Sequence, residues 1–221
     1  MRNLVVTDLG ADRAYSEVLA IQEKLHAQRV ADKIPDTLLL LEHRPVYTLG
    51  RSATASHILY SAERLRAAGI ERVETSRGGD VTYHGPGQLV GYPIIHLGMV
   101  GLRVLEYINA LEEILIQTVA TYGVTATRDS RNRGVWIGNN KLAALGIRVS
   151  HQVTMHGFAL NVAPHLSDYQ GILACGLSNA GVTSLACHLP QAPALSDVKN
   201  RVVDEFRTQL GYRTTHADCS L

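Results

Sequence analysis

The spacing of apolar residues along the chain predicts several amphipathic helices. In residues 102–122, apolar side chains recur every three or four positions, at Leu105, Ile108, Leu111, Leu115, Val119 and Tyr122. This spacing places them on one face of a helix, which would cover a core. The same period predicts helices over residues 15–28, 61–68 and 195–210. The chain therefore contains helices that need a sheet or other helices to cover their apolar faces.

Strands are expected between these helices. Residues 153–162 alternate between larger apolar and smaller or polar side chains, the pattern of a half-buried strand. Gly138 and Asn139 separate two β-forming runs, residues 135–137 and 141–149, and predict a tight hairpin. Further strands are expected over residues 3–8, 37–42, 71–75, 81–83 and 89–95. Because many strands follow one another without a helix between them, the order predicts an α+β fold with a mixed, largely antiparallel sheet.

Length and charge narrow the class of protein. The 221 residues suit one domain over residues 1–221, with about the last ten residues as a tail. A net charge of +1 provides no broad attraction for nucleic acid or an anionic membrane. No apolar run is long enough to span a bilayer, and Asp8 interrupts the start of the chain where a signal peptide would be apolar. We expect a soluble, cytoplasmic protein.

A glycine-rich segment, residues 77–88, reads Arg-Gly-Gly-Asp-Val-Thr-Tyr-His-Gly-Pro-Gly-Gln. Its glycine spacing fits neither a P-loop nor a dinucleotide-binding fingerprint, so the motif does not indicate nucleotide binding. Such a segment between Arg77 and His84 can bring backbone N–H groups and two polar side chains onto a carbonyl or carboxylate group. The alternative is a turn with a purely structural role.

Cys175 is a candidate nucleophile because small residues flank it and leave its sulfur approachable. A thiol must ionise near neutral pH to act in this way, which requires a nearby cation or helix N-terminus. The candidate cations are Lys141, His84, His151 and His156. The alternatives are a buried, inert cysteine, an exposed hairpin lysine and ordinary surface or core histidines.

The other cysteines suggest neither a disulfide framework nor a metal site. Cys187 and Cys219 stand at spacings unrelated to Cys175, and the chain has no C-x-x-C motif. Cys187 and His188 would form half of a metal site, but no second ligand pair follows at the required spacing. No metal site is predicted.

Several motifs in the same order closely resemble one known family. They are residues 34–51, 77–88, 134–148 and 156–162, followed by Cys175 and Gly176. Together they resemble the octanoyl-[acyl carrier protein]:protein N-octanoyltransferases over about residues 1–210. The resemblance implies the fold of the biotin and lipoate protein ligase catalytic domains, with a mixed sheet packed against helices.

The resemblance also implies a reaction and roles for individual residues. Cys175 would take the octanoyl group from octanoyl-acyl carrier protein as a thioester and pass it to a specific lysine of an apo lipoyl domain. Lys141 matches the family's site lysine, which lowers the pKa of the thiol. The residues that match the substrate-binding segments are Arg77, Gly78, Gly79, Asp80, Val81, Thr82, Tyr83, His84, Ala144, Leu145, Gly146, Gly157, Phe158 and Ala159.

Partners and cofactors follow from the same resemblance. The implied acceptors are lipoyl domains of 2-oxoacid dehydrogenase E2 subunits and the glycine cleavage H protein, and neither ATP nor a metal is expected. The family is usually monomeric. The chain departs from its pattern at Ala174, where proline is usual, and at Asp80, where glutamine or glutamate is usual. The alternatives are an ATP-dependent lipoate or biotin ligase on the same fold, an acyl thioesterase and a non-catalytic acyl-binding module.

Overall fold

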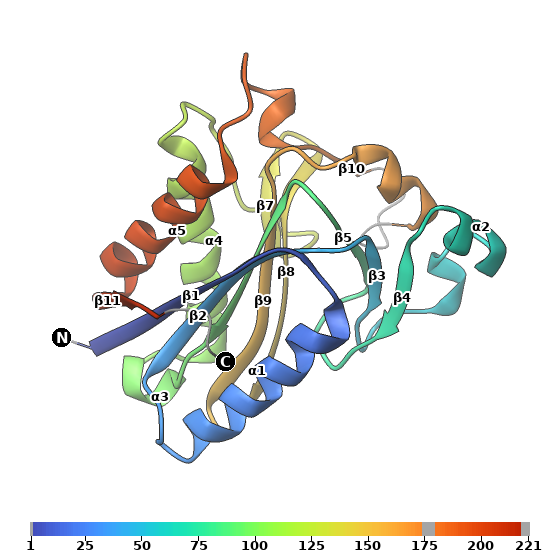
Figure 1. The fold of residues 1–221 in the computed structure, drawn as a ribbon. Coiled ribbons are helices and arrows are strands. Elements are labelled where there is room, and N and C mark those ends of the chain that lie inside the picture. Colours follow the sequence, from blue (N-terminus) through green and yellow to red (C-terminus); the bar gives the residue numbers. More distant parts are fainter. Residues whose placement is uncertain (1, 174–179, 218–221) are drawn as a thin grey trace.

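A computed structural model of the protein describes residues 2–173 and 180–217, and places two sheets side by side (Figure 1). The large sheet has the strand order β10-β8-β9-β6-β2-β1-β11, with β7 paired to β8. The small sheet has the order β4-β3-β5. The strands are β1 (Arg2–Arg13), β2 (Asp36–His43), β3 (Val46–Leu49), β4 (Glu71–Glu74), β5 (Val81–His84), β6 (Gln88–Ile94), β7 (Gly134–Ile137), β8 (Asn140–Ser150), β9 (Val153–Asn161), β10 (Gly181–Val182) and β11 (Tyr212–His216).

The large sheet is mixed, as predicted. Strands β7, β8, β9, β6 and β2 pair antiparallel, whereas β1 runs parallel to both β2 and β11, and β10 runs parallel to β8. The hairpin predicted around Gly138 joins β7 to β8, and Gly138 has the positive φ of +56° that such a turn uses. An α+β fold with a largely antiparallel sheet is therefore confirmed.

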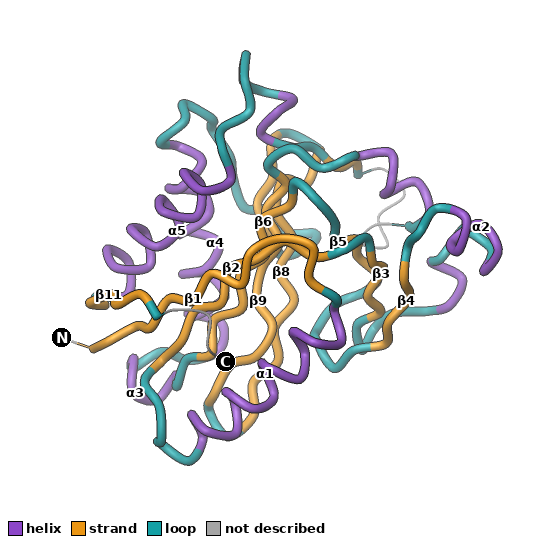
Figure 2. Tube along the Cα trace, viewed as in Figure 1, coloured by secondary structure: helices purple, strands orange, loops and turns teal. Residues whose placement is uncertain are grey.

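Helices cover both faces of the large sheet. The described helices are α1 (Tyr15–Val30), α2 (Ala62–Ala67), α3 (Leu97–Val100), α4 (Val104–Ala120) and α5 (Leu195–Leu210). Helices α1, α4 and α5 pack on the large sheet, whereas α2 packs on the small sheet through Leu65. Strand β2 shows why two layers are needed, because Leu38 and Leu40 enter the core beneath α4 and α5 while Leu39 and Leu41 enter the core beneath α1. Figure 2 shows α1 on one side of the strands and α4 and α5 on the other. In residues 2–173 and 180–217, no helix combines the length and apolar character needed to cross a membrane.

Some elements differ from the sequence expectation. Helix α4 turns Tyr107, Leu111 and Ile114 into the core, while Leu105, expected on the buried face, is 55% exposed. Strand β3 follows Pro45 directly, where the sequence predicted only the end of the preceding strand. The tail expected at the C-terminus is wrong for residues 212–216, because they form β11 and pair with β1.

A buried carboxylate, Asp36, fastens this C-terminal strand to the rest of the sheet. Asp36 lies at the start of β2 and is 4% exposed. Its Oδ1 accepts hydrogen bonds from Arg29 Nε at 2.7 Å and from the His96 backbone N–H at 2.9 Å. Its Oδ2 accepts one from the Tyr212 hydroxyl at 2.7 Å. One side chain thus joins α1, β2, the segment before α3, and β11.

Replacing Asp36 by alanine is expected to lower the free energy of unfolding by about 1.5 to 3 kcal/mol, because three groups lose their hydrogen bonds to a buried carboxylate while Arg29 keeps its ion pair with Asp32. Urea unfolding followed by circular dichroism measures the change. The matched control is Asp12→Asn, which removes an exposed ion pair with Arg44 while keeping a residue that tolerates the positive φ of +56° at this position, and it should leave the unfolding midpoint unchanged. Equal midpoints for the Asp36 and Asp12 variants would contradict this role.

Candidate active site

A pocket of about 580 Å³, part of it open to solvent, lies where the two sheets meet. Strands β8 and β9 form one wall, β5 and the segment before it form another, and the first residue of α1 reaches the inner end. The lining residues are Tyr15, Arg77, Gly79, Asp80, Val81, Thr82, His84, Tyr92, Asn132, Lys141, Ala144, Leu145, Gly146, His156, Gly157, Phe158 and Ala159.

All of the predicted substrate-binding residues except Gly78 and Tyr83 line this pocket, and so does Lys141. Tyr83 lies on β5 between Thr82 and His84, and its hydroxyl donates a hydrogen bond to Asp168 Oδ2 at 2.7 Å. Gly78 instead donates its N–H to the Ile147 carbonyl on β8, at 3.0 Å. Cys175 lies outside the described residues, so its position relative to Lys141 stays a prediction.

Close backbone contacts shape the pocket walls. Gly79 has a φ of +84°, and a Cβ on the neighbouring Gly50 would overlap the Gly79 carbonyl. On the opposite wall, a Cβ on Gly91 of β6 would overlap the Phe158 ring. The ring therefore packs directly on the β6 backbone, which leaves room for the pocket in front of it.

Arg77 is a buried cation that connects the small sheet to the pocket. Its Nε donates to Thr48 Oγ1 on β3 at 3.0 Å, and its Nη1 donates to the Gly78 carbonyl at 3.0 Å. The side chain thereby holds the glycine-rich segment between β3 and β8. Its charge also lies close enough to disfavour protonation of His84 and His156.

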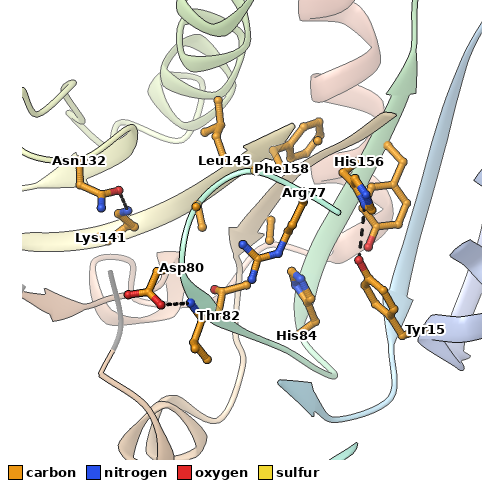
Figure 3. Close-up of a pocket in the computed structure, with 17 residues that line it drawn as sticks. Tyr15, Arg77, Asp80, Thr82, His84, Asn132, Lys141, Leu145, His156 and Phe158 are labelled. Atoms are coloured by element: carbon orange, nitrogen blue, oxygen red, sulfur yellow. Dashed lines mark hydrogen bonds between the residues drawn. The ribbon is translucent and has the colours of Figure 1, made fainter. Parts of the chain in front are cut away.

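Lys141 stands at the opposite end of the pocket from Tyr15 (Figure 3). Its Nζ donates to Asn132 Oδ1 at 2.6 Å and to the Arg133 carbonyl at 3.1 Å, and lies 4.8 Å from the centre of the Trp136 ring. Lys141 lies near the start of the hairpin strand β8, where an exposed side chain was the alternative, but the residue is buried, with only 5% of its surface exposed. A buried amine held by two acceptors and one aromatic face is positioned to interact with a group in the pocket.

The inner end of the pocket is built from neutral histidines and tyrosines. Burial lowers the pKa of His43 to about 4, that of His84 to about 3 and that of His156 to about 4. His43 Nδ1 lies 3.0 Å from the Arg13 carbonyl, so this nitrogen carries the proton and Nε2 accepts from the Tyr92 hydroxyl at 2.8 Å.

The Gln88 amide fixes the tautomer of His84. Gln88 Nε2 lies within hydrogen-bond distance of the Tyr83 carbonyl at 3.1 Å and of Asn161 Oδ1 at 2.9 Å. Because both of these atoms are acceptors, the amide nitrogen must face them, and Gln88 Oε1 faces His84 Nδ1 at 2.7 Å. His84 therefore donates from Nδ1, and its Nε2 carries a lone pair.

Asp80, the position that departs from the family pattern, is held at the pocket wall. Its Oδ2 lies 2.6 Å from His57 Nδ1, and its Oδ1 accepts from the Val81 backbone N–H at 2.7 Å. Both carboxylate oxygens thus have partners within the protein. The shorter side chain keeps a hydrogen-bonding role next to the pocket.

Among the candidate cations, only some reach the pocket. Lys141, His84 and His156 line it, whereas His151 lies exposed in the turn between β8 and β9. The two histidines are neutral because of burial, so Lys141 is the candidate that carries charge. The sequence reasoning missed Tyr15, Tyr92 and Asn132, since nothing in their local sequence distinguishes them from core or loop residues.

Comparison with known proteins identifies the family. Residues 14–207 match the lipoyl protein ligase A/B catalytic domain family. An octanoyltransferase from Chloroflexus aurantiacus is 47% identical over 209 residues, covering 93% of each chain. One from Caldicellulosiruptor saccharolyticus is 46% identical over 199 residues, covering 89% of this chain and 85% of that protein. The chain belongs to the octanoyltransferase family. It is accordingly an acyltransferase.

Solved structures agree with the fold of this octanoyltransferase family member. Lipoate-protein ligase A bound with ATP superposes with a TM-score of 0.77 at 12% identity, over 99% of this chain and 89% of that chain. A biotin protein ligase from Aquifex aeolicus gives a TM-score of 0.53 at 11% identity, over 96% of this chain and 69% of that chain. At these identities the likeness concerns the fold alone, and it confirms the expected ligase-like catalytic fold.

The three neutral histidines predict how stability depends on pH. An unfolded histidine takes up a proton near pH 6.5, whereas these folded histidines stay neutral until about pH 4, 3 and 4. Above about pH 7 these histidines therefore leave the free energy of unfolding unaffected. As the pH drops below 6.5, the free energy of unfolding falls by up to about 1.4 kcal/mol per pH unit for each histidine. Urea unfolding at pH 7.5, 6 and 5 measures this slope.

Replacing one buried histidine supplies the control. His43→Gln should reduce the pH dependence of the free energy of unfolding by about one third, because one of the three contributing histidines is gone and glutamine does not titrate in this range. His151→Gln, in the exposed turn, should leave the slope as it is in the wild type. A slope that is the same for the His43 variant and the wild type would refute the assignment.

Proposed function

We propose that this acyltransferase moves an octanoyl group from octanoyl-acyl carrier protein to a lipoyl-domain lysine through a thioester on Cys175. The main support is the pocket, in which the amine of Lys141 stands beside a largely apolar chamber. This arrangement provides a place for an acyl chain and a proton donor and acceptor at its reactive end. Membership in the octanoyltransferase family supports the choice of acyl group.

In the first step, the Cys175 thiolate attacks the carbonyl carbon of the donor thioester. The carrier thiolate leaves and takes a proton, for which the Lys141 ammonium is the proposed source. An ammonium group beside a thiol favours the thiolate form. The two acceptors that hold Nζ, Asn132 Oδ1 and the Arg133 carbonyl, fix the direction from which that proton arrives.

In the second step, the amine of the acceptor lysine attacks the Cys175 thioester. The Cys175 thiolate leaves, an amide forms, and the proton lost by the attacking amine passes to Lys141. A thioester is reactive enough for this aminolysis without further activation. We therefore propose that the reaction needs neither ATP nor a metal ion.

The apolar walls provide the binding energy for the acyl chain. Ala144, Leu145, Phe158 and Ala159 line the pocket from two adjacent strands. At about 0.8 kcal/mol for each buried methylene group, a seven-carbon tail contributes roughly 5 kcal/mol before the costs of binding. This is enough to discriminate an octanoyl group from a much shorter one.

The proposed acceptors are apo lipoyl domains of 2-oxoacid dehydrogenase E2 subunits and of the glycine cleavage H protein. A solved archaeal lipoylation system, a bipartite lipoate protein ligase with its E2 lipoyl domain, has the same fold with a TM-score of 0.71 at 13% identity. We further propose that the protein acts as a monomer in the cytoplasm.

Incubation with octanoyl-acyl carrier protein is expected to add the mass of one octanoyl group to the wild-type protein, as measured by intact-protein mass spectrometry. Cys175→Ser should abolish this adduct, because an alcohol is a far weaker nucleophile than a thiolate at neutral pH. Cys187→Ala is the matched control, since Cys187 is an exposed free thiol and its loss should leave the adduct intact. An undiminished adduct on the Cys175 variant would overturn the mechanism.

The same assay separates the alternatives. An ATP-dependent ligase requires ATP for product formation, whereas the proposed reaction proceeds in its absence. A thioesterase would lose the acyl group in buffer, while the proposed acyl-enzyme persists until a lipoyl domain is added. A non-catalytic acyl-binding module would form no covalent adduct.

Lys141→Ala is expected to slow formation of the acyl-enzyme by about two to four orders of magnitude at pH 7, the usual range for loss of a positioned acid or base. The rate should recover partly toward pH 9, where the thiol ionises without help. Stopped-flow measurement of acylation between pH 6 and 9 tests this. A loss of the same size at every pH would contradict activation of the thiol by Lys141.

A further inference from the structure

The pocket has an open end and a closed end. Its open end contains Asn132, which lies between the exposed residues Arg131 and Arg133, and the exposed residue Gly79. Its closed end contains Tyr15 and His156, each 1% exposed. Figure 3 shows Lys141 and Asn132 on one side of the pocket and Tyr15 and His156 on the other, with Arg77 between them. An acyl group whose carbonyl lies near Lys141 must therefore direct its tail toward Tyr15 and His156.

His156 holds an unusual backbone conformation at this closed end. It lies within β9 but has a φ of +58°, in the left-handed region that residues other than glycine rarely occupy. Strand β6 pairs with β9 only as far as Phe158, and Pro93 of β6 has no N–H to offer beyond that point. The backbone of β9 thus departs from its pairing with β6 at His156, while its pairing with β8 continues through this residue.

A side chain from the first helix compensates for this departure. The His156 backbone N–H donates to Gln22 Oε1 at 2.9 Å, and Gln22 is completely buried. The imidazole of His156 has its Nδ1 3.5 Å from the Tyr15 hydroxyl and its Nε2 3.4 Å from Ser76 Oγ. The backbone and the ring are therefore both fixed where they close the pocket.

The aromatic rings around His156 are closely packed. Tyr92 packs edge-on against His156 with ring centres 6.4 Å apart, and Tyr15 stacks on His84 at 6.2 Å. All four residues are buried and are supported from behind by α1, β2 and β6. A longer acyl tail would have to displace this packed group of rings.

We propose that His156, together with Tyr15, sets the maximum length of the acyl chain that the pocket accepts. The left-handed conformation of His156 directs its ring across the end of the pocket, and Gln22 is the positioning residue that holds this conformation. This inference deepens the proposed function and rests on it for the direction of the chain. The ligand class it specifies is a saturated medium-chain acyl group that ends at these two rings.

His156→Gly is the test variant. Glycine adopts positive φ readily, so the substitution removes the ring without adding backbone strain. His151→Gly is the matched control, because His151 also has a positive φ, of +50°, but lies exposed in the turn between β8 and β9. Tyr15→Ala opens the same end from α1 and provides an independent second variant, with thermal unfolding used to check that each protein is folded.

Two measurements are made with acyl chains of 8, 10, 12 and 14 carbons. The first is kcat/KM for transfer from acyl-acyl carrier proteins to a lipoyl domain. The second is the Kd of the free fatty acids, followed by the fluorescence of Trp136, the single tryptophan of the chain, which lies against Lys141. Because each buried methylene group strengthens binding roughly fourfold, the ratio of dodecanoyl to octanoyl should rise about tenfold or more in His156→Gly.

The outcomes separate the two proposals. A shift to longer chains in His156→Gly and Tyr15→Ala, with a wild-type profile in His151→Gly, supports the length limit. Wild-type preferences in both pocket variants would overturn it, even if octanoyl transfer is intact. If the wild-type protein transfers no acyl group while the fatty-acid Kd values still shift, the proposed function fails and the length limit stands. If His156→Gly does not fold, the Tyr15 variant decides.

Discussion

The arrangement of the site depends on one buried guanidinium. Arg77 bonds to Thr48 of the small sheet and to the Gly78 carbonyl, and Gly78 in turn bonds to Ile147 of the large sheet. A planar group with five donors can join several acceptors at fixed angles, which an ammonium group cannot do. The pocket lies in the space that this connection maintains between the two sheets. The hydrogen bonds of Arg77 that hold the two sheets together thus also form the pocket between them.

The same cation shapes the electrostatics of the pocket. A buried positive charge near His84 and His156 adds to the effect of burial and keeps both rings neutral. Neutral rings can border an apolar chain at low cost, whereas charged rings would require water or counter-ions there. The formal charge around the pocket is thereby limited to a few fixed groups, chiefly Arg77, Asp80 and Lys141. The polar residues at the inner end are compatible with an apolar ligand for this reason.

Much of the fold followed from local patterns in the sequence. The hairpin at Gly138 and the helix over residues 195–210 were predictable because a tight turn and an amphipathic face have strong local signatures. Strand β3 was not, since its four residues are all buried and show no alternation after Pro45. Strand β11 was missed for another reason, because its pairing with β1 is decided by contacts across almost the whole chain.

In the candidate site too, some residues could be predicted from local sequence and others depend on the fold. The glycine-rich segment and Lys141 were recognisable from motifs that are continuous in the sequence, and nearly all of those residues line the pocket. Tyr15 and Tyr92 come from a helix and a strand that also read as ordinary core elements, and only the fold brings them to the pocket. Sequence patterns identify the residues at the reactive end better than those at the closed end.

The position of β11 has a consequence for synthesis of the chain. Among the described elements, β1 is synthesised first, and its partner β11 follows the other strands and helices. During translation, the backbone groups of β1 on that side therefore stay unpaired until β11 emerges. An open strand edge of this kind can pair with other nascent chains. Pairing with β11 thus removes an open strand edge that β1 exposes while the residues between them are being made.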